Sequence, residues 1–194
     1  MTSKLTEKQG AFLLNLARET ITDKLKAPGK KDADIIVPEK DKDTISKKKR
    51  GVFITLHKDH ELRGCIGTIE AARSIVEGVK YNALNAAFHD PRFSPVTKNE
   101  LEKINIEVSI LTKPVKIKYD NTNDLIDKIT PFQDGVIIKK KNCSATFLPQ
   151  VWDQLPDCEL FLSHLCRKAG LKANEWQKND LEVSLYQVQY FNEE

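Results

Sequence analysis

The sequence lacks the features that assign many proteins to a class at first sight. Its 194 residues contain no long apolar run, so no segment is predicted to span a bilayer. The start of the chain, Met1–Leu5, has no apolar stretch of the kind found in secretory signals. These absences predict a soluble, cytoplasmic protein without a membrane partner.

Metal-binding and disulfide patterns are also missing. The four cysteines are Cys65, Cys143, Cys158 and Cys166. No two of them have the short spacing of a zinc or redox pair. His57 and His60 are the one close pair of histidines, and no third ligand accompanies them in the sequence. We therefore predict reduced thiols and no metal site, and the sequence indicates no particular cofactor.

The charges nearly balance, with 31 basic and 28 acidic residues and a formal net charge of +3. Nucleic-acid-binding domains usually carry a concentrated basic surface, and no DNA- or RNA-binding motif is present here. The densest run of charge covers residues 30–50 and mixes both signs, so we predict a charged surface loop there. The sequence does not favour a nucleic-acid partner.

Apolar periodicity predicts an α+β fold. Helical spacing predicts helices over Thr6–Lys26, Ser74–Phe88 and Cys158–Ala169, and Thr6 with Gln9 forms a capping-box pair at the first of them. Alternation of period two predicts strands near residues 51–57, 61–68, 104–111, 115–119, 135–138, 144–148 and 181–185.

Two parts of the chain repeat one pattern. Gly135–Ile138 resembles Gly51–Ile54, and Leu181–Leu185 nearly duplicates Ile106–Ile110. Each half has the order strand, strand, helix, strand, with about 80 residues between equivalent points. We predict an internal ββαβ duplication in which the two similar strings occupy equivalent strands.

The first two strands are predicted to form a hairpin with a three-residue loop. This loop length pairs His57 with Glu61, Thr55 with Arg63 and Phe53 with Cys65. The predicted apolar face consists of Val52, Ile54, Leu56, Leu62 and Ile66. The predicted polar face consists of Phe53, Thr55, His57, Arg63 and Cys65.

The most informative motif is Leu62–Gly67, which places a cysteine two positions from an arginine and between two glycines. Glycine inside a strand often marks a bulge or a close approach of another group to the backbone. Gly64 and Gly67 are therefore candidate ligand-binding positions. A nearby guanidinium favours the thiolate form of a cysteine, so Cys65 is a candidate catalytic thiol with Arg63 as its activating and ligand-binding neighbour.

Each of these residues also has a structural interpretation. A free cysteine is often buried and inert, and a nucleophile needs a nearby base, for which His57 and His89 are the candidates. An arginine within a strand requires either a carboxylate, such as Asp90, or an anionic ligand. Asp90 and Arg92 either bind that ligand or form a helix-end cap and an ion pair.

Four strings together resemble one family. They are LRGCIGT at 62–68, DPRF at 90–93, EVSIL at 107–111 and ATFLPQV at 145–151, with weaker support from LCRKAG at 165–170. Their order and spacing are similar to those of the AMMECR family (Alport syndrome, mental retardation, midface hypoplasia and elliptocytosis chromosomal region), over residues 10–192. The resemblance implies one α+β domain of two unequal, interleaved lobes on antiparallel sheets, with both termini in the larger lobe. It also implies a cysteine motif near the cleft between the lobes.

The resemblance leaves the ligand, the reaction and the pathway open, because the family has no agreed activity. Roles in transcription, replication, repair and translation are among those proposed. Some prokaryotic members accompany Memo-type and radical-SAM proteins, which are therefore candidate partners.

Two hypotheses follow. The first is a ligand or substrate site between the lobes around Arg63 and Cys65, which leaves open whether the protein is an enzyme. The second is a non-enzymatic adaptor or regulator that binds another protein. A site predicts a pocket with an accessible sulfur, whereas an adaptor predicts a flat, exposed apolar patch.

Overall fold

The computed structural model describes residues 4–27, 48–69 and 71–193, and the chain divides into two compact units. The first unit comprises Met1–Leu111 and Gln189–Glu194, and the second comprises Thr112–Val188. Of the charged loop predicted over residues 30–50, all but the last three residues lie outside the described part of the chain.

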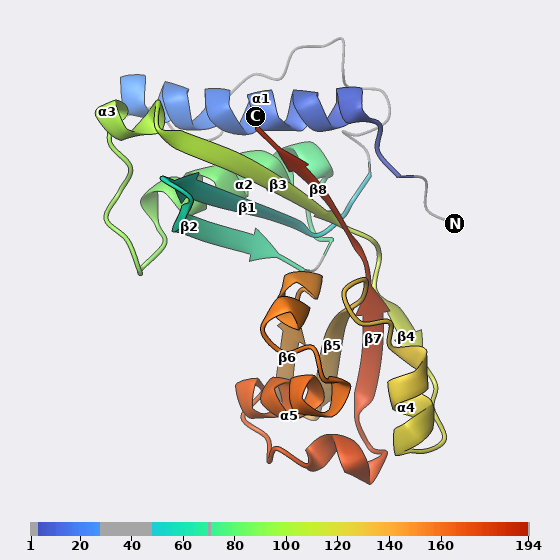
Figure 1. Cartoon of the computed structure of the whole chain (residues 1–194). Helices are drawn as coiled ribbons and strands as arrows, with labels where there is room; N and C mark the ends of the chain where they lie inside the picture. Colours follow the sequence, from blue (N-terminus) through green and yellow to red (C-terminus); the bar gives the residue numbers. More distant parts are fainter. Residues whose placement is uncertain (1–3, 28–47, 70, 194) are drawn as a thin grey trace. The chain divides into compact units, whose positions relative to one another are not determined.

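The first unit is a four-stranded sheet with helices on one face (Figure 1). Its elements are α1 (Glu7–Lys26), β1 (Val52–Lys58), β2 (Glu61–Thr68), α2 (Ile75–Phe88), α3 (Lys98–Leu101), β3 (Ile104–Leu111) and β8 (Val188–Asn192). The strand order is β2-β1-β3-β8, so β2 and β8 are the edge strands. The central strand β1 is antiparallel to both of its neighbours.

The core of this unit is formed by the apolar faces of its helices and strands, which the sequence patterns predicted. Thr6 and Gln9 make the capping box that begins α1, as the sequence predicted. Leu13 and Ala17, on the apolar side of α1, are fully buried in the same core as Ile54 of β1 and Val108 of β3. The alternating residues of β1 and β3 point to the opposite, more polar face of the sheet.

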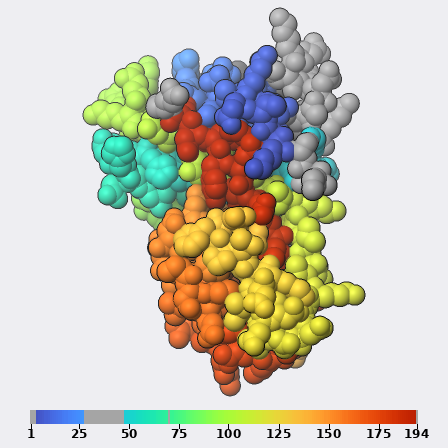
Figure 2. Space-filling view, turned by 45° about the vertical axis from the view of Figure 1, so that its right-hand side comes forward, coloured from blue at the N-terminus to red at the C-terminus, as the bar shows by residue number. Residues whose placement is uncertain are grey.

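Residues near the two ends of the chain are bonded to each other in this unit. Leu5 donates its N–H to the Gln189 side chain at 2.8 Å, and the same amide donates back to the Leu5 carbonyl at 2.7 Å. Arg18 of α1 pairs with the Glu193 carboxylate. Figure 2 shows the C-terminal residues, in red, lying against the N-terminal residues, in blue.

The predicted register of the first hairpin is wrong. The loop has two residues, Asp59 and His60, and both have positive φ (52° and 66°), as in a type I′ turn. Thr55 pairs with Cys65, instead of with Arg63, because a bulge adds one residue to the shift that the shorter loop makes. This bulge shifts the register between Leu56 and His57 and adds one residue to β2.

The bulge changes which side chains face the core. Leu62, predicted as a core residue, is 40% exposed. Ile66, beyond the bulge, packs against the core as predicted, as do Val52, Ile54 and Leu56. A bulge reverses the alternation of the residues on its far side, which explains why only Leu62 is misplaced.

The second unit has its own sheet and core. Its elements are β4 (Val115–Ile117), α4 (Thr122–Lys128), β5 (Gly135–Lys140), β6 (Cys143–Phe147), η3 (Pro149–Asp153), α5 (Cys158–Lys168), η4 (Glu175–Lys178) and β7 (Glu182–Tyr186). The strand order is β4-β7-β5-β6. Trp152 stacks on Phe161 with 3.6 Å between ring centroids, and Trp176 is also buried. Both tryptophans are thus core residues.

The two units repeat one ββαβ topology, as the sequence predicted. In each, the first strand lies between the second and the third, giving β2-β1-β3 and β6-β5-β7. The registers also match. Val52 pairs with Ile110 and Val136 pairs with Leu185, so the similar strings Ile106–Ile110 and Leu181–Leu185 occupy equivalent positions. The chain therefore has the predicted α+β fold.

No helix in the described part of the chain is long and apolar enough to cross a membrane.

Candidate functional site

The backbone of Cys65 is held from outside the sheet. Cys65 lies on the edge strand β2, and its N–H donates to a carboxylate oxygen of Asp90 at 2.9 Å. Its carbonyl accepts from Nη2 of Arg92 at 3.1 Å. Unpaired edge groups usually attract another strand, and here Asp90 and Arg92 occupy the place that such a strand would take.

Asp90 links Cys65 to Arg92, because it accepts hydrogen bonds from both residues. Its carboxylate is almost fully buried and also accepts three hydrogen bonds from Arg92: from the backbone N–H, from Nε and from Nη2. The guanidinium, followed by the Cys65 N–H, holds the pKa of Asp90 well below its usual range. The side chains are thus locked together as a charged pair, while the Arg92 side chain stays 52% exposed.

Arg63 belongs to a separate ion pair. Its Nε donates to Glu100 at 2.7 Å and its Nη2 donates to the other Glu100 oxygen at 3.1 Å. Lys58 contributes a further contact, and these interactions, led by the one from Arg63, lower the pKa of Glu100 to about 2. The acid that pairs with Arg63 is therefore Glu100, through Nε and Nη2, whereas Asp90 pairs with Arg92.

Phe93 lies near both arginines. The Arg63 guanidinium carbon is 5.8 Å from the centre of its ring, and that of Arg92 is 5.4 Å away. Both distances are within the range of cation–π attraction. The DPRF string thus supplies three side chains that position the LRGCIG string: Asp90, Arg92 and Phe93.

The two glycines of the cysteine motif have packing roles. A Cβ at Gly64 would lie 2.3 Å from the carbonyl oxygen of Ala86 in α2. A Cβ at Gly67 would lie 2.1 Å from the ring of Phe53. Glycine is therefore needed at both positions for close approach of protein groups, which accounts for the motif without a ligand.

The Cys65 thiol itself is only partly buried. Thr55, directly opposite on β1, donates its hydroxyl hydrogen to the sulfur at 3.5 Å. Thr55 in turn pairs with Glu107 of β3, so Cys65, Thr55 and Glu107 form one row across three strands. Among the described residues, neither His57 nor His89 hydrogen-bonds to the sulfur, and His89 instead ends α2.

The other cysteines have different surroundings. Burial, with a smaller effect of Asp157 and Glu159, raises the pKa of Cys158 to about 11. Burial also raises the pKa of Cys166. Both therefore remain protonated at neutral pH. Cys143 lies, partly buried, at the start of β6.

The described residues contain no group of three or more histidine, cysteine, aspartate or glutamate side chains arranged to hold a metal ion.

The family follows from a comparison with known proteins. Residues 14–191 match the family model AMMECR1, and this match covers nearly the whole chain. The chain belongs to the AMMECR1 family. The four strings from which the resemblance was predicted lie inside the matched region, and two of them, LRGCIGT and DPRF, are hydrogen-bonded to each other.

Relatives that match along nearly their whole length support this membership. The chain is 42% identical to Protein MK0488 of Methanopyrus kandleri over 202 residues, covering 100% of this chain and 93% of the relative. It is 39% identical to Protein MJ0810 of Methanocaldococcus jannaschii, covering 97% and 92%. Among solved structures, the uncharacterized protein PH0010 from Pyrococcus horikoshii matches with a TM-score of 0.85 and 35% identity, covering 99% and 95%. These names state no ligand or reaction.

Two residues that contact the candidate residues were not predicted from the sequence. Thr55 was placed on the correct face but paired with Arg63, because the loop length was wrong. Glu100 lies 37 positions from Arg63, and its only local signal is the capping box that it forms with Thr97. The predicted residues do not all contact one another. Cys65 bonds to Asp90 and Arg92, whereas Arg63 pairs with Glu100.

Proposed function

We propose that this AMMECR1-family protein binds a small ligand beside β2, with the Cys65 thiol and the Arg92 guanidinium as the two contacting groups. The observation that carries the proposal is the Asp90 carboxylate, which fixes the Cys65 backbone and the Arg92 side chain at the same time. A site built in this way is already organised before a ligand arrives, which lowers the entropy cost of binding.

The remaining predicted site residues support these two groups. Arg63, paired with Glu100, lies within cation–π range of Phe93, as Arg92 does. Gly64 and Gly67 allow β2 to approach α2 and Phe53. Asp90 aligns Arg92, and all of these residues belong to the first unit.

The partial exposure of both contacting groups suits a ligand that meets them from solvent. The hydroxyl of Thr55 donates to the Cys65 sulfur, and the guanidinium of Arg92 is close enough to interact with Cys65 electrostatically. A cysteine sulfur can attack an electrophile, and a guanidinium can bind an anionic group beside it. The hydrogen bond to Asp90 raises the pKa of Arg92, with smaller contributions from the charge of Asp90 and from Cys65. The ligand class that fits is a small molecule with an electrophilic carbon or sulfur and an anionic group.

The adaptor hypothesis has less support among the described residues. Their exposed large apolar side chains come from five different segments: Leu62, Tyr81, Val115, Phe132 and Leu160. Tyr81 is also covered by the guanidinium of Arg73, 4.0 Å from the ring centre. Single exposed apolar side chains are normal on any surface and do not make a binding patch.

Ligands retained from cell extract test this proposal. The full chain, Cys65→Ser and Cys143→Ser would be purified in parallel and examined by native mass spectrometry. We expect a bound small molecule or adduct on the wild type and on Cys143→Ser, and its loss from Cys65→Ser, because only Cys65 has the Arg92 contact. Equal retention by Cys65→Ser, or a wild type that carries nothing, contradicts the proposal.

A further inference from the structure

The polar face of the first sheet carries a hollow of about 190 Å³. It is lined by His57, His60, Asn105, Ile106, Glu107, Asn192 and Glu193. The residues come from β1, β3, β8 and the β1–β2 turn, and the hollow does not include Cys65. Its volume is below that of the usual drug-sized pocket and gives room for about six water molecules.

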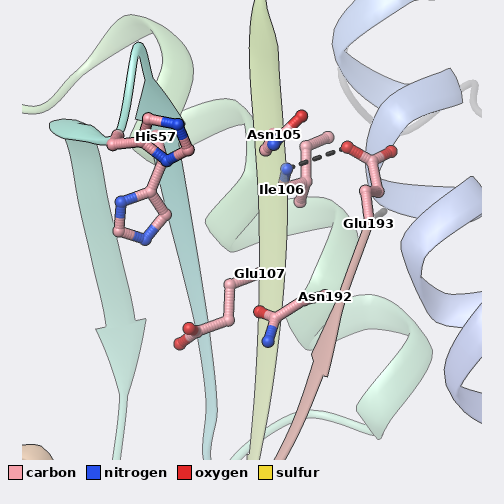
Figure 3. A pocket seen from close by; sticks show the side chains of 7 residues that line it. His57, Asn105, Ile106, Glu107, Asn192 and Glu193 are labelled. Atoms are coloured by element: carbon pink, nitrogen blue, oxygen red, sulfur yellow. Dashed lines mark hydrogen bonds between the residues drawn. The ribbon is translucent and has the colours of Figure 1, made fainter.

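The sheet register sets the positions of the lining side chains. His57 lies directly opposite Asn105, and Glu107 lies one row further along β3, opposite Thr55. In Figure 3, His57 and Asn105 are at the upper end of the hollow, and Glu107 and Asn192 are at its lower end. These side chains leave neighbouring strands on one face of the sheet, so they line the hollow together.

Two of the lining residues are held in place by other groups. The Glu193 carboxylate accepts the Ile106 N–H at 2.8 Å and pairs with Arg18, which neutralises its charge. Ser109 donates its hydroxyl hydrogen to Glu107 at 3.0 Å. A carboxylate has about four lone-pair sites, so Glu107 can accept from a ligand as well as from its protein partners.

The chemistry of the lining selects a class of ligand. The imidazoles of His57 and His60 and the carboxamides of Asn105 and Asn192 can each donate and accept hydrogen bonds. The lining contains no lysine or arginine, and the carboxylate of Glu107 opposes an anion. Hydroxyl groups also donate and accept, so several of them on one small molecule match this set of side chains.

We propose that this hollow is a binding site for a small, uncharged, polyhydroxylated molecule of about the size of a pentose. Asn105 and Asn192 bind hydroxyl groups from opposite sides, and Glu107 accepts hydrogen bonds from one or two more. The site is separate from the one proposed at Cys65, since neither Cys65 nor Arg92 lines it.

Binding of D-ribose to the ¹⁵N-labelled full chain, followed by NMR, tests this inference. We expect saturable shifts of the amide signals of residues 105–107 and 192–193 at millimolar ribose. The double variant Asn105→Ala/Asn192→Ala should bind at least about tenfold more weakly, because two hydrogen-bonding side chains are lost. Both asparagines are exposed, so the fold should persist.

Asn123→Ala, at an exposed position of α4 in the second unit, is the matched control and should bind as the wild type does. Ribose 5-phosphate should bind more weakly than ribose, because its phosphate meets Glu107, and Glu107→Gln should reduce that difference. The inference is overturned if ribose causes no saturable shift, if the shifts lie elsewhere, or if the double variant binds unchanged.

Discussion

Replacing Asp90 with asparagine is expected to lower the free energy of unfolding by about 3 kcal/mol. The carboxylate is 2% exposed and accepts hydrogen bonds from the Cys65 N–H and from Arg92. Asparagine keeps the shape of the side chain but loses the charge and one hydrogen-bond acceptor. The hydrogen bonds that hold Arg92 and the Cys65 backbone at the edge of β2 are therefore weakened. Urea unfolding of the purified variant measures the change.

Glu182→Gln is the matched control for this variant. Glu182 also pairs with a cation, Lys116, but both side chains are about 60% exposed. Exposed ion pairs contribute little to stability, so this variant should unfold nearly as the wild type does. A similar loss in both variants would mean that the burial of Asp90 is not what makes its ion pair important.

The difference in unfolding free energy between the wild type and Asp90→Asn should also depend on pH. The folded pKa of Asp90 lies below its usual value of 3.8, so its charge stabilises the folded state above the unfolded pKa. This stabilisation is lost as the pH falls through the range below about 4. The gap between the wild type and Asp90→Asn should therefore be full at about pH 6 and narrow at about pH 3. A gap that is constant with pH contradicts the assignment.

Gly64→Ala is expected to lower the free energy of unfolding by about 3 kcal/mol. The added methyl group would lie 2.3 Å from the backbone oxygen of Ala86, and no rotation of a side chain can relieve that contact. The strand and α2 must separate instead. Thermal or urea unfolding would show the loss.

Gly67→Ala provides the comparison. Its methyl group would also clash, at 2.1 Å from Cγ of Phe53, but this is a partly exposed side chain that can move away by a change of rotamer about its Cα–Cβ bond, whereas the Ala86 backbone cannot. We expect a cost of about 1 kcal/mol there. If the two variants lose the same stability, close approach of the α2 backbone is not the reason for glycine at position 64.

The sequence was sufficient for the parts of the fold that depend on local patterns. The capping box at Thr6 and the apolar stripe of α1 are properties of a few consecutive residues. The ββαβ repeat was visible because Ile106–Ile110 and Leu181–Leu185 carry nearly the same string, and the registers align them.

The hairpin register could not be predicted for a physical reason. Type I′ turns usually contain Asn-Gly or Asp-Gly, and here Asp59 and His60 adopt positive φ without glycine. The bulge beside His57 has no sequence signal of its own apart from Gly64. Because of these two features, Cys65 pairs with Thr55 and not with Phe53, the partner predicted from the sequence.

The contacts among the candidate site residues were not predicted from the sequence. Cys65, Asp90 and Arg92 were identified from their strings, yet Arg63 is paired with Glu100, a residue far along the chain. The hollow near Asn105 was missed because its lining comes from three strands and a turn. Contacts between distant residues depend on the sheet order, which local patterns do not specify.

The most direct test of the proposed site is the alkylation rate of each cysteine in the native protein. Iodoacetamide labelling, resolved by peptide mass spectrometry, would compare the wild type with Arg92→Gln and Arg63→Gln. We predict that Cys65 reacts fastest of the four and that Arg92→Gln slows it several-fold. Arg63→Gln should have the smaller effect, because Arg92 bonds directly to the Cys65 carbonyl. Arg63 instead contacts Glu100, Ser94 and Phe93. A Cys65 that reacts no faster than Cys143, or that is indifferent to Arg92→Gln, contradicts the proposed site.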